Sequence, residues 1–126
     1  MQTEKQKFDK EEFKKRLYKF ILKLIEFIDK LPKDRVSNII GNQLLRSGTS
    51  ILGNYIEGQS SSSKKEFLTF IQYCLKSSNE SKVWIAVLRD SGRTTREKAQ
   101  WFLEELDEYS NIFASSVLTI KGKRSI

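Results

Sequence analysis

Two long helices joined by a polar loop are predicted by residues 42–90, NQLLRSGTSILGNYIEGQSSSSKKEFLTFIQYCLKSSNESKVWIAVLRD. The loop is the run at 58–63, and Ser63 with Glu66 has the spacing of a capping box, which starts a helix. After the loop, apolar and small residues recur at alternating steps of four and three: Phe67, Ile71, Cys74, Ser78, Ser81, Ile85 and Leu88. This spacing places them on one face, so we expect a helix over residues 64–90.

The segment before the loop predicts a helix over residues 32–57, with Pro32 in its first turn, where its missing N–H is tolerated. The run Ser47-Gly48-Thr49-Ser50 breaks its apolar pattern with poor helix formers. Close approach of another backbone explains such a patch, and a local kink is the alternative. Counted outward from the loop, the patch faces the small residues of 74–81, which favours close packing.

Two further helices are predicted on either side, over residues 10–31 and 95–121. Asp9 with Glu12 and Thr94 with Glu97 have capping-box spacing. Short connections force consecutive helices to lie antiparallel, and 126 residues suit one domain. We therefore expect an all-α fold, an antiparallel up-down-up-down four-helix bundle.

The helix at 10–31 has an apolar surface wider than one packing seam. The seam itself consists of Phe13, Leu17, Phe20, Leu24, Phe27 and Leu31. A second stripe lies beside it, made of Tyr18, Ile21, Ile25 and Ile28. Neighbouring positions are about 100° apart on a helix, so three neighbours in the same chain cannot cover both stripes. The sequence therefore predicts a homo-oligomer.

The composition favours binding over catalysis. Histidine is absent, which removes the commonest general base and metal ligand, and Cys74 is the only cysteine, at a core position. We expect no enzyme activity, no cofactor and no metal. A secretory signal and a membrane-spanning apolar run are both missing, which predicts a cytoplasmic protein without a membrane partner.

The net charge of +7 suits a polyanionic partner such as RNA or DNA. In the predicted bundle, one end gathers the start of the first helix, the 58–63 loop and the C-terminus. The candidate nucleic-acid-binding residues at this basic end are Lys14, Lys15, Arg16, Lys64, Lys65, Lys121, Lys123 and Arg124. Aromatic residues fall mostly at core spacing, so base-stacking platforms are not expected and contacts should be directed at the phosphate backbone.

Acidic and basic helix faces offer a second use of charge. Residues 104–108 carry four carboxylates, and Arg16, Lys19, Lys23 and Lys30 lie along one side of the first helix. These complementary faces would guide one subunit onto the next. Ordinary solvated helix surface is the alternative.

Residues 46–80 contain an Arg-x-x-x-Ser-Ile-x-x-Asn-x-x-Glu-Gly stretch, followed by a serine loop, a phenylalanine and a glutamate. The matching positions are Arg46, Ser50, Ile51, Asn54, Glu57, Gly58, the loop at 60–63, Phe67 and Glu80. The segment resembles the four-helix bundle proteins encoded in intervening sequences of bacterial 23S ribosomal RNA genes, also called S23 ribosomal proteins. It is also similar to the accessory variability determinant of diversity-generating retroelements.

The resemblance implies a closed homopentamer without catalytic activity and with a role in nucleic-acid binding. Because the related retroelement protein acts with a reverse transcriptase, a protein adaptor for such an enzyme is the alternative function. Arg46, Ser50, Asn54 and Glu57 share one helix face, which can meet Glu80 across the bundle. We interpret these five residues as a buried or interfacial Arg–Glu pair with an Asn cross-link that sets the register, in preference to a catalytic set.

Overall fold

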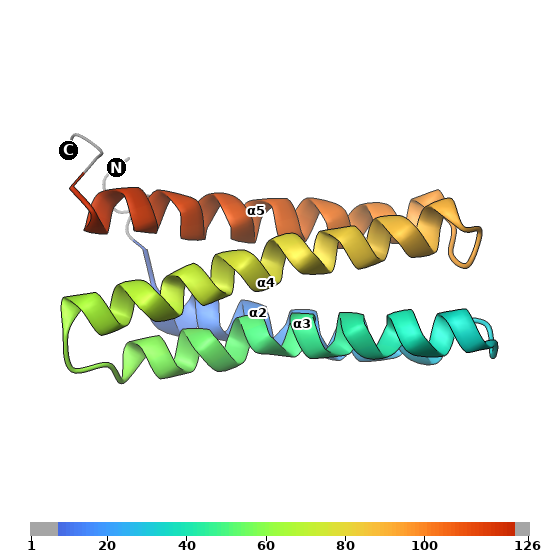
Figure 1. Ribbon diagram of the computed structural model, residues 1–126, viewed down its shortest axis with the longest axis horizontal. Helices are drawn as coiled ribbons and strands as arrows, with labels where there is room; N and C mark the ends of the chain where they lie inside the picture. Colours follow the sequence, from blue (N-terminus) through green and yellow to red (C-terminus); the bar gives the residue numbers. More distant parts are fainter. Residues whose placement is uncertain (1–7, 123–126) are drawn as a thin grey trace.

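The computed structural model describes residues 8–122, which form four helices and no strand. Their bounds are α2 Lys10–Asp29, α3 Arg35–Gln59, α4 Lys64–Asp90 and α5 Arg96–Ile120. Consecutive helices run antiparallel through short connections (Figure 1). The all-α four-helix prediction is confirmed, and no described helix is long and apolar enough to cross a bilayer.

All four helices begin where a side chain caps the first free N–H groups. Asp9 accepts from the N–H of Glu11 at 3.0 Å, as predicted for the start of α2. Ser63 accepts from the N–H of Glu66 at 3.0 Å, as predicted for α4. At α5 the cap is Thr95, whose hydroxyl accepts from the N–H of Lys98, so the assignment of this role to Thr94 was wrong by one residue.

The predicted start of α3 at Pro32 was also wrong, because the helix begins at Arg35. Asp34 is extended and its carboxylate accepts from the N–H of Ser37 at 2.7 Å, which makes it the N-cap. Leu31, between the helices, is buried in the core. α2 thus ends two residues before the predicted Leu31, and Pro32 lies in the connection that leads to the cap at Asp34.

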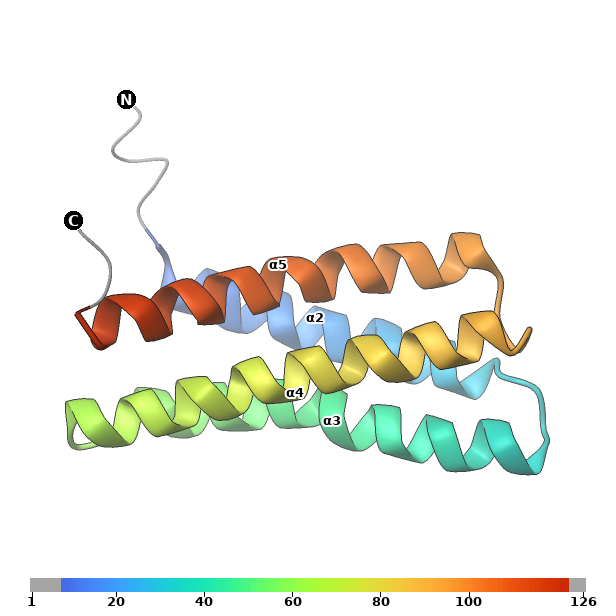
Figure 2. The ribbon, with the colours of Figure 1, turned by 45° about the horizontal axis from the view of Figure 1, so that its top comes forward.

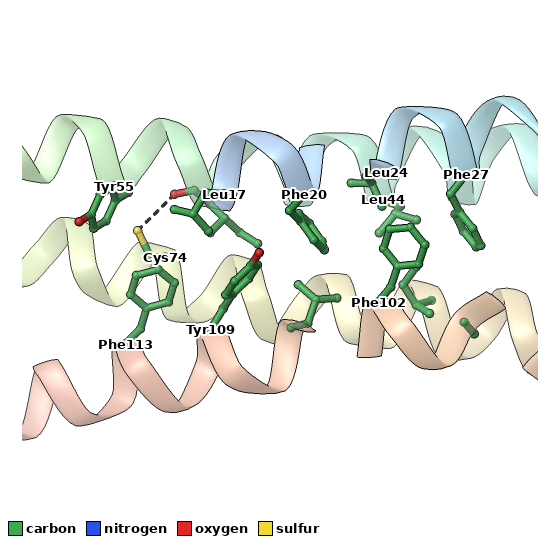
Figure 3. Packing of buried hydrophobic residues seen from close by; sticks show 14 of the residues in the cluster. Leu17, Phe20, Leu24, Phe27, Leu44, Tyr55, Cys74, Phe102, Tyr109 and Phe113 are labelled. Atoms are coloured by element: carbon green, nitrogen blue, oxygen red, sulfur yellow. Dashed lines mark hydrogen bonds between the residues drawn. The ribbon is translucent and has the colours of Figure 1, made fainter. Parts of the chain in front are cut away.

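The core lies between the inward faces of α2 and α5 and those of the α3–α4 pair. All six seam residues predicted on the first helix are buried, and α5 adds Ala99, Phe102, Leu106, Tyr109 and Phe113. Figure 3 shows Phe20 and Phe27 pointing at the aromatic rings of α5. Phe20 meets Phe102 at a centroid distance of 5.9 Å and Tyr109 at 5.3 Å. Interlocked aromatic rings thus fill the space between α2 and α5.

The small residues of α3 and α4 meet, as the sequence predicts. Ser47 Oγ lies 2.7 Å from Ser81 Oγ, and Ser77 Oγ donates to Ser50 Oγ at 3.0 Å. Cys74 Sγ donates to the carbonyl oxygen of Ile51 at 3.4 Å, the dashed contact in Figure 3. Since α3 is one unbroken helix across this patch, close packing is confirmed and the kink is not needed.

The seam between α2 and α5 is more open. No α-carbon of α2 comes within 8 Å of an α-carbon of α5. The helices that follow one another along the chain do approach each other that closely. Large rings and long charged side chains therefore span this gap. The consequence is a groove along the α2–α5 seam with hollows at the surface.

Candidate nucleic-acid interface

The basic end predicted from the sequence exists as a place in the fold. The start of α2, the α3–α4 loop and the end of α5 lie together at one end of the bundle (Figures 1 and 2). Lys15, Lys64, Lys65 and Lys121 are exposed there. Lys14 is half-buried, with its ammonium 3.5 Å from Glu11. Lys123 and Arg124 lie outside the described residues.

The described part of this end is less basic than the sequence count suggests. Among the described residues, the start of α2, the α3–α4 loop with the turns beside it, and Lys121 together supply seven basic and five acidic side chains. The opposite end, which holds the α2–α3 and α4–α5 connections, supplies seven basic and four acidic side chains. The described residues of the predicted basic end therefore have an excess of two positive charges, one fewer than those of the opposite end, and the other charged residues that the sequence assigns to it lie outside the described residues.

Arg16 differs from the other members of the predicted set because its charge is balanced inside the chain. Its Nε donates to Glu105 at 2.7 Å and its Nη2 to Glu108 at 2.6 Å. Tyr109 also donates to Glu105, at 2.7 Å. The hydrogen bond to Glu105 raises the pKa of Arg16. Burial opposes ionisation of Glu105, but hydrogen bonds from Arg16 and Tyr109 hold the pKa of this carboxyl below its usual value.

These pairs also change the interpretation of the acidic cluster on α5. Glu105 and Glu108 are taken by Arg16, and Asp107 accepts from Lys82 at 3.0 Å. Two cations thus neutralise half of the charge of the four carboxylates within one chain, which reduces what is left to guide a neighbouring subunit. The only signal for the Arg16–Glu105 contact in the sequence is the presence of opposite charges on two helices that lie side by side in a bundle.

Of the motif residues of α3, Arg46 and Ser50 meet α4 as predicted, whereas the predicted Asn cross-link was wrong because Asn54 donates to Ser50 within its own helix. Arg46 pairs with Glu80, which also accepts from Trp84 Nε1 at 3.1 Å. Asn54 Nδ2 donates to Ser50 Oγ at 2.8 Å. Glu57 is exposed on the same helix.

The predicted burial of the Arg–Glu pair was wrong for the single chain. The Arg46 and Glu80 side chains are 57% and 30% exposed. The pair lies at the surface because the small residues beneath it let α3 and α4 close the core without it. Its place at an interface between copies stays a prediction.

The buried ionisable groups offer no ready nucleophile. Burial raises the pKa of the Cys74 thiol to about 12, and burial likewise raises the pKa of Tyr55 to about 12. Both groups are therefore protonated at neutral pH. Within residues 8–122, no three His, Cys, Asp or Glu side chains gather closely enough to hold a metal ion.

An apolar surface runs along the outside of α2. Tyr18, Leu22 and Ile25 follow one another at steps of four and three and are 57%, 52% and 40% exposed. Tyr18 also lines a hollow of about 310 Å³ with Leu52 and Ile56 of α3. We call these five residues the α2–α3 apolar surface. Of the predicted second stripe, Ile21 and Ile28 are partly buried against the core.

The fold and these surfaces define a small four-helix bundle protein whose exposed features are an apolar helix face and basic ends. The family model of the 23S rRNA-intervening sequence protein matches residues 9–115, and the chain belongs to this family. No curated protein matches the chain.

A solved structure supports the same assignment. The chain is similar to a protein of unknown function from the S23 ribosomal protein family of Bacteroides thetaiotaomicron, with a TM-score of 0.75 and 25% identity. The match covers 82% of this chain and 96% of that one. The family resemblance seen in residues 46–80 is thereby confirmed, whereas the similarity to the retroelement protein stays a prediction.

Proposed function

We propose that the protein is a non-enzymatic homo-oligomer that binds the phosphate backbone of RNA or DNA through its basic bundle ends. The observation that carries the proposal is the row of Tyr18, Leu22 and Ile25, which is exposed along α2 although its spacing is that of a packing seam. Burying one such side chain fully contributes roughly 1.5–3 kcal/mol. A second copy of the chain is the partner that is always present to cover it.

Self-association would gather the weak charge of each chain into a usable site. The described part of the basic end has a small charge excess, and Arg16 is already paired. A ring or cluster of copies would repeat Lys15, Lys64, Lys65 and Lys121 around one axis. A phosphate backbone would then contact several chains at once, which multiplies modest contacts into useful affinity. The pentamer implied by the family resemblance is the assembly we expect.

The double variant Lys64→Glu/Lys65→Glu tests this proposal. Both residues are exposed in the first turn of α4, where acidic side chains suit the helix dipole, so the fold is preserved. The readout is binding of fluorescent single-stranded RNA and duplex DNA over a salt series. We expect the native protein to lose affinity steeply with salt, and the variant to bind about tenfold more weakly near 0.1 M salt.

The matched control is Lys76→Glu, which changes the charge of an exposed residue on α4 away from the basic end. We expect it to alter the affinity by less than about twofold. Binding that is absent, or that does not respond to salt or to the change at Lys64 and Lys65, would contradict the proposal.

A protein adaptor is the second candidate function, and the outward face of α4 favours it. Tyr73, Val83 and Val87 are exposed on this face at helical spacing. A reverse transcriptase-like partner seated there would give a complex that survives nuclease and moderate salt. Co-purification from the native host, with and without Val83→Glu, tests this alternative. It is contradicted if no protein is retained, or if the variant retains it equally well.

A further inference from the structure

A hollow of about 480 Å³ lies at the end of the bundle opposite the predicted basic end. It is formed by the last turns of α2, the α4–α5 connection and the first turns of α5. Its volume falls within the roughly 300–1,000 Å³ of small-molecule sites. The open α2–α5 seam creates it, and we call it the α2–α5 hollow.

The lining of the α2–α5 hollow carries a net positive charge. Four basic side chains contribute to its wall and one carboxylate does: Lys23, Lys30, Arg93 and Lys98 against Glu26. Lys30 and Lys98 are exposed, and the ammonium of Lys30 is 3.9 Å from Glu26. Arg93 is held by Asp34 at 3.3 Å, which fixes the guanidinium at the rim. The charges of this wall therefore favour an anion.

The same hollow has an aromatic wall. Trp101 is 40% exposed and lies on the flank of α5 that faces α2. Its ring is fixed by Phe102, edge-on at 5.0 Å, and by Phe20, nearly parallel at 6.2 Å. Lys23 Nζ sits 5.2 Å from the centroid of the indole. Trp101 is thus an exposed aromatic side chain, although most of the tryptophans and phenylalanines were expected at core positions.

We propose that the α2–α5 hollow binds a nucleotide, with the base stacked on Trp101 in place of the exposed Lys23 ammonium and the phosphate held by Lys30 and Lys98. An inorganic anion would leave the indole unused, and an uncharged aromatic molecule would leave the cations unused. A nucleotide carries a flat π system and a phosphate a few bonds apart, and base–aromatic stacking with nearby cations is a general way to bind it. The nucleotide comes either from solution or from an unpaired end of an RNA or DNA strand. In the second case the site rests on the proposed nucleic-acid function.

The fluorescence of Trp101 reports occupancy directly. In the full chain carrying Trp84→Phe, Trp101 is the only indole, and adenosine 5′-monophosphate is titrated against it. We expect saturable quenching, with adenosine and inorganic phosphate each about tenfold weaker because each supplies one half of the contacts. The native chain and Trp101→Phe are compared as a second pair, which does not depend on the folding of Trp84→Phe. We expect quenching in the native chain and none in Trp101→Phe, because the indole at the site is gone.

Charge reversal at the wall tests the phosphate contacts. Lys30→Glu/Lys98→Glu changes two exposed residues and should weaken the nucleotide by about tenfold. Lys76→Glu carries the same kind of change outside the hollow and should leave the affinity within about twofold. Equal quenching in the double variant and the control would overturn the proposal.

Short 5′-phosphorylated single-stranded RNA separates the two sources of the nucleotide. Quenching by the strand at concentrations below those needed for the mononucleotide assigns the site to a nucleic-acid end, and the reverse order assigns it to a free nucleotide. If neither quenches Trp101, the α2–α5 hollow is not a nucleotide site. The proposed function would still be judged separately, because it is measured by the response to Lys64 and Lys65 at the other end.

Discussion

Glu105 of α5 links α2 to α5, because it accepts hydrogen bonds from Arg16 of α2 and from Tyr109 of its own helix. Its side chain is only 16% exposed, so little water replaces these donors when the contact is lost. Hydrogen bonds to charged groups contribute roughly 1.5–3 kcal/mol, which the partial exposure of Arg16 reduces. Glu105 is thus the more buried of the two carboxylates, Glu105 and Glu108, that link α2 to α5 through Arg16.

Glu105→Gln should therefore lower the free energy of unfolding by about 1–2 kcal/mol near pH 7. Because the folded pKa of Glu105 lies below its ordinary value of 4.5, its contribution is present above that pH and is lost as the pH falls below it. The difference between native and variant protein should shrink near pH 3. Urea unfolding at both pH values measures it, with the exposed Glu104→Gln as the control. An equal loss at both pH values would contradict this account.

Gly48 and Gly53 lie on the same helix and predict opposite results for the same substitution. A Cβ at Gly48 would lie 2.3 Å from Cδ2 of Leu24, which is fully buried, whereas nothing lies within 4 Å of a Cβ at Gly53. Gly48→Ala should destabilise by about 1–3 kcal/mol through overpacking. Gly53→Ala should stabilise by about 0.5–1 kcal/mol, since alanine favours the helix. Urea unfolding at one protein concentration compares them, and equal stabilities would contradict the packing.

The start of α3 is a property of the element, and it depends on Asp34. The N–H of Ser37 donates to this carboxylate and, with the weaker contact of Arg93, lowers its pKa. Asp34→Ala should lower the stability by removing the cap, whereas Asp34→Asn keeps an acceptor for the cap and should lower it less. Urea unfolding of both variants checks the order. Equal losses would mean that the charge on Asp34 matters and the cap does not.

The helices themselves could be predicted because their causes are local. The seam from Phe13 to Leu31 and the caps at Asp9 and Ser63 follow from spacing alone, and all of them hold in the structure. The start of α3 could not be predicted, because Pro32 and Asp34 both suit a helix start and the burial of Leu31 decides between them.

The candidate site was predicted less completely than the helices. The sequence predicted which elements meet at one end of the bundle, and it predicted the Arg46–Glu80 contact. It did not give the partner of Arg16 or the exposure of Trp101, since both depend on how far apart α2 and α5 stand. That separation is a property of the packed bundle, and no local pattern in either helix records it.

At the scale of the whole molecule, the outer face of α2 is the apolar surface that the single chain leaves exposed to water. Leu22→Glu/Ile25→Glu changes two residues that are exposed in one chain, so it should leave the helix content intact. We expect the double variant to be a folded monomer, because a carboxylate at each position opposes burial against a second copy. Val83→Glu, on the outward face of α4, is the control and should keep the native assembly.

The mass of the full native chain in solution, measured by light scattering across a dilution series, tests this account most directly. The α2–α3 apolar surface predicts a stable assembly whose mass is a multiple of 14.7 kDa, with five chains expected from the family resemblance. A folded, unaggregated species of 14.7 kDa that persists at micromolar concentration would contradict it.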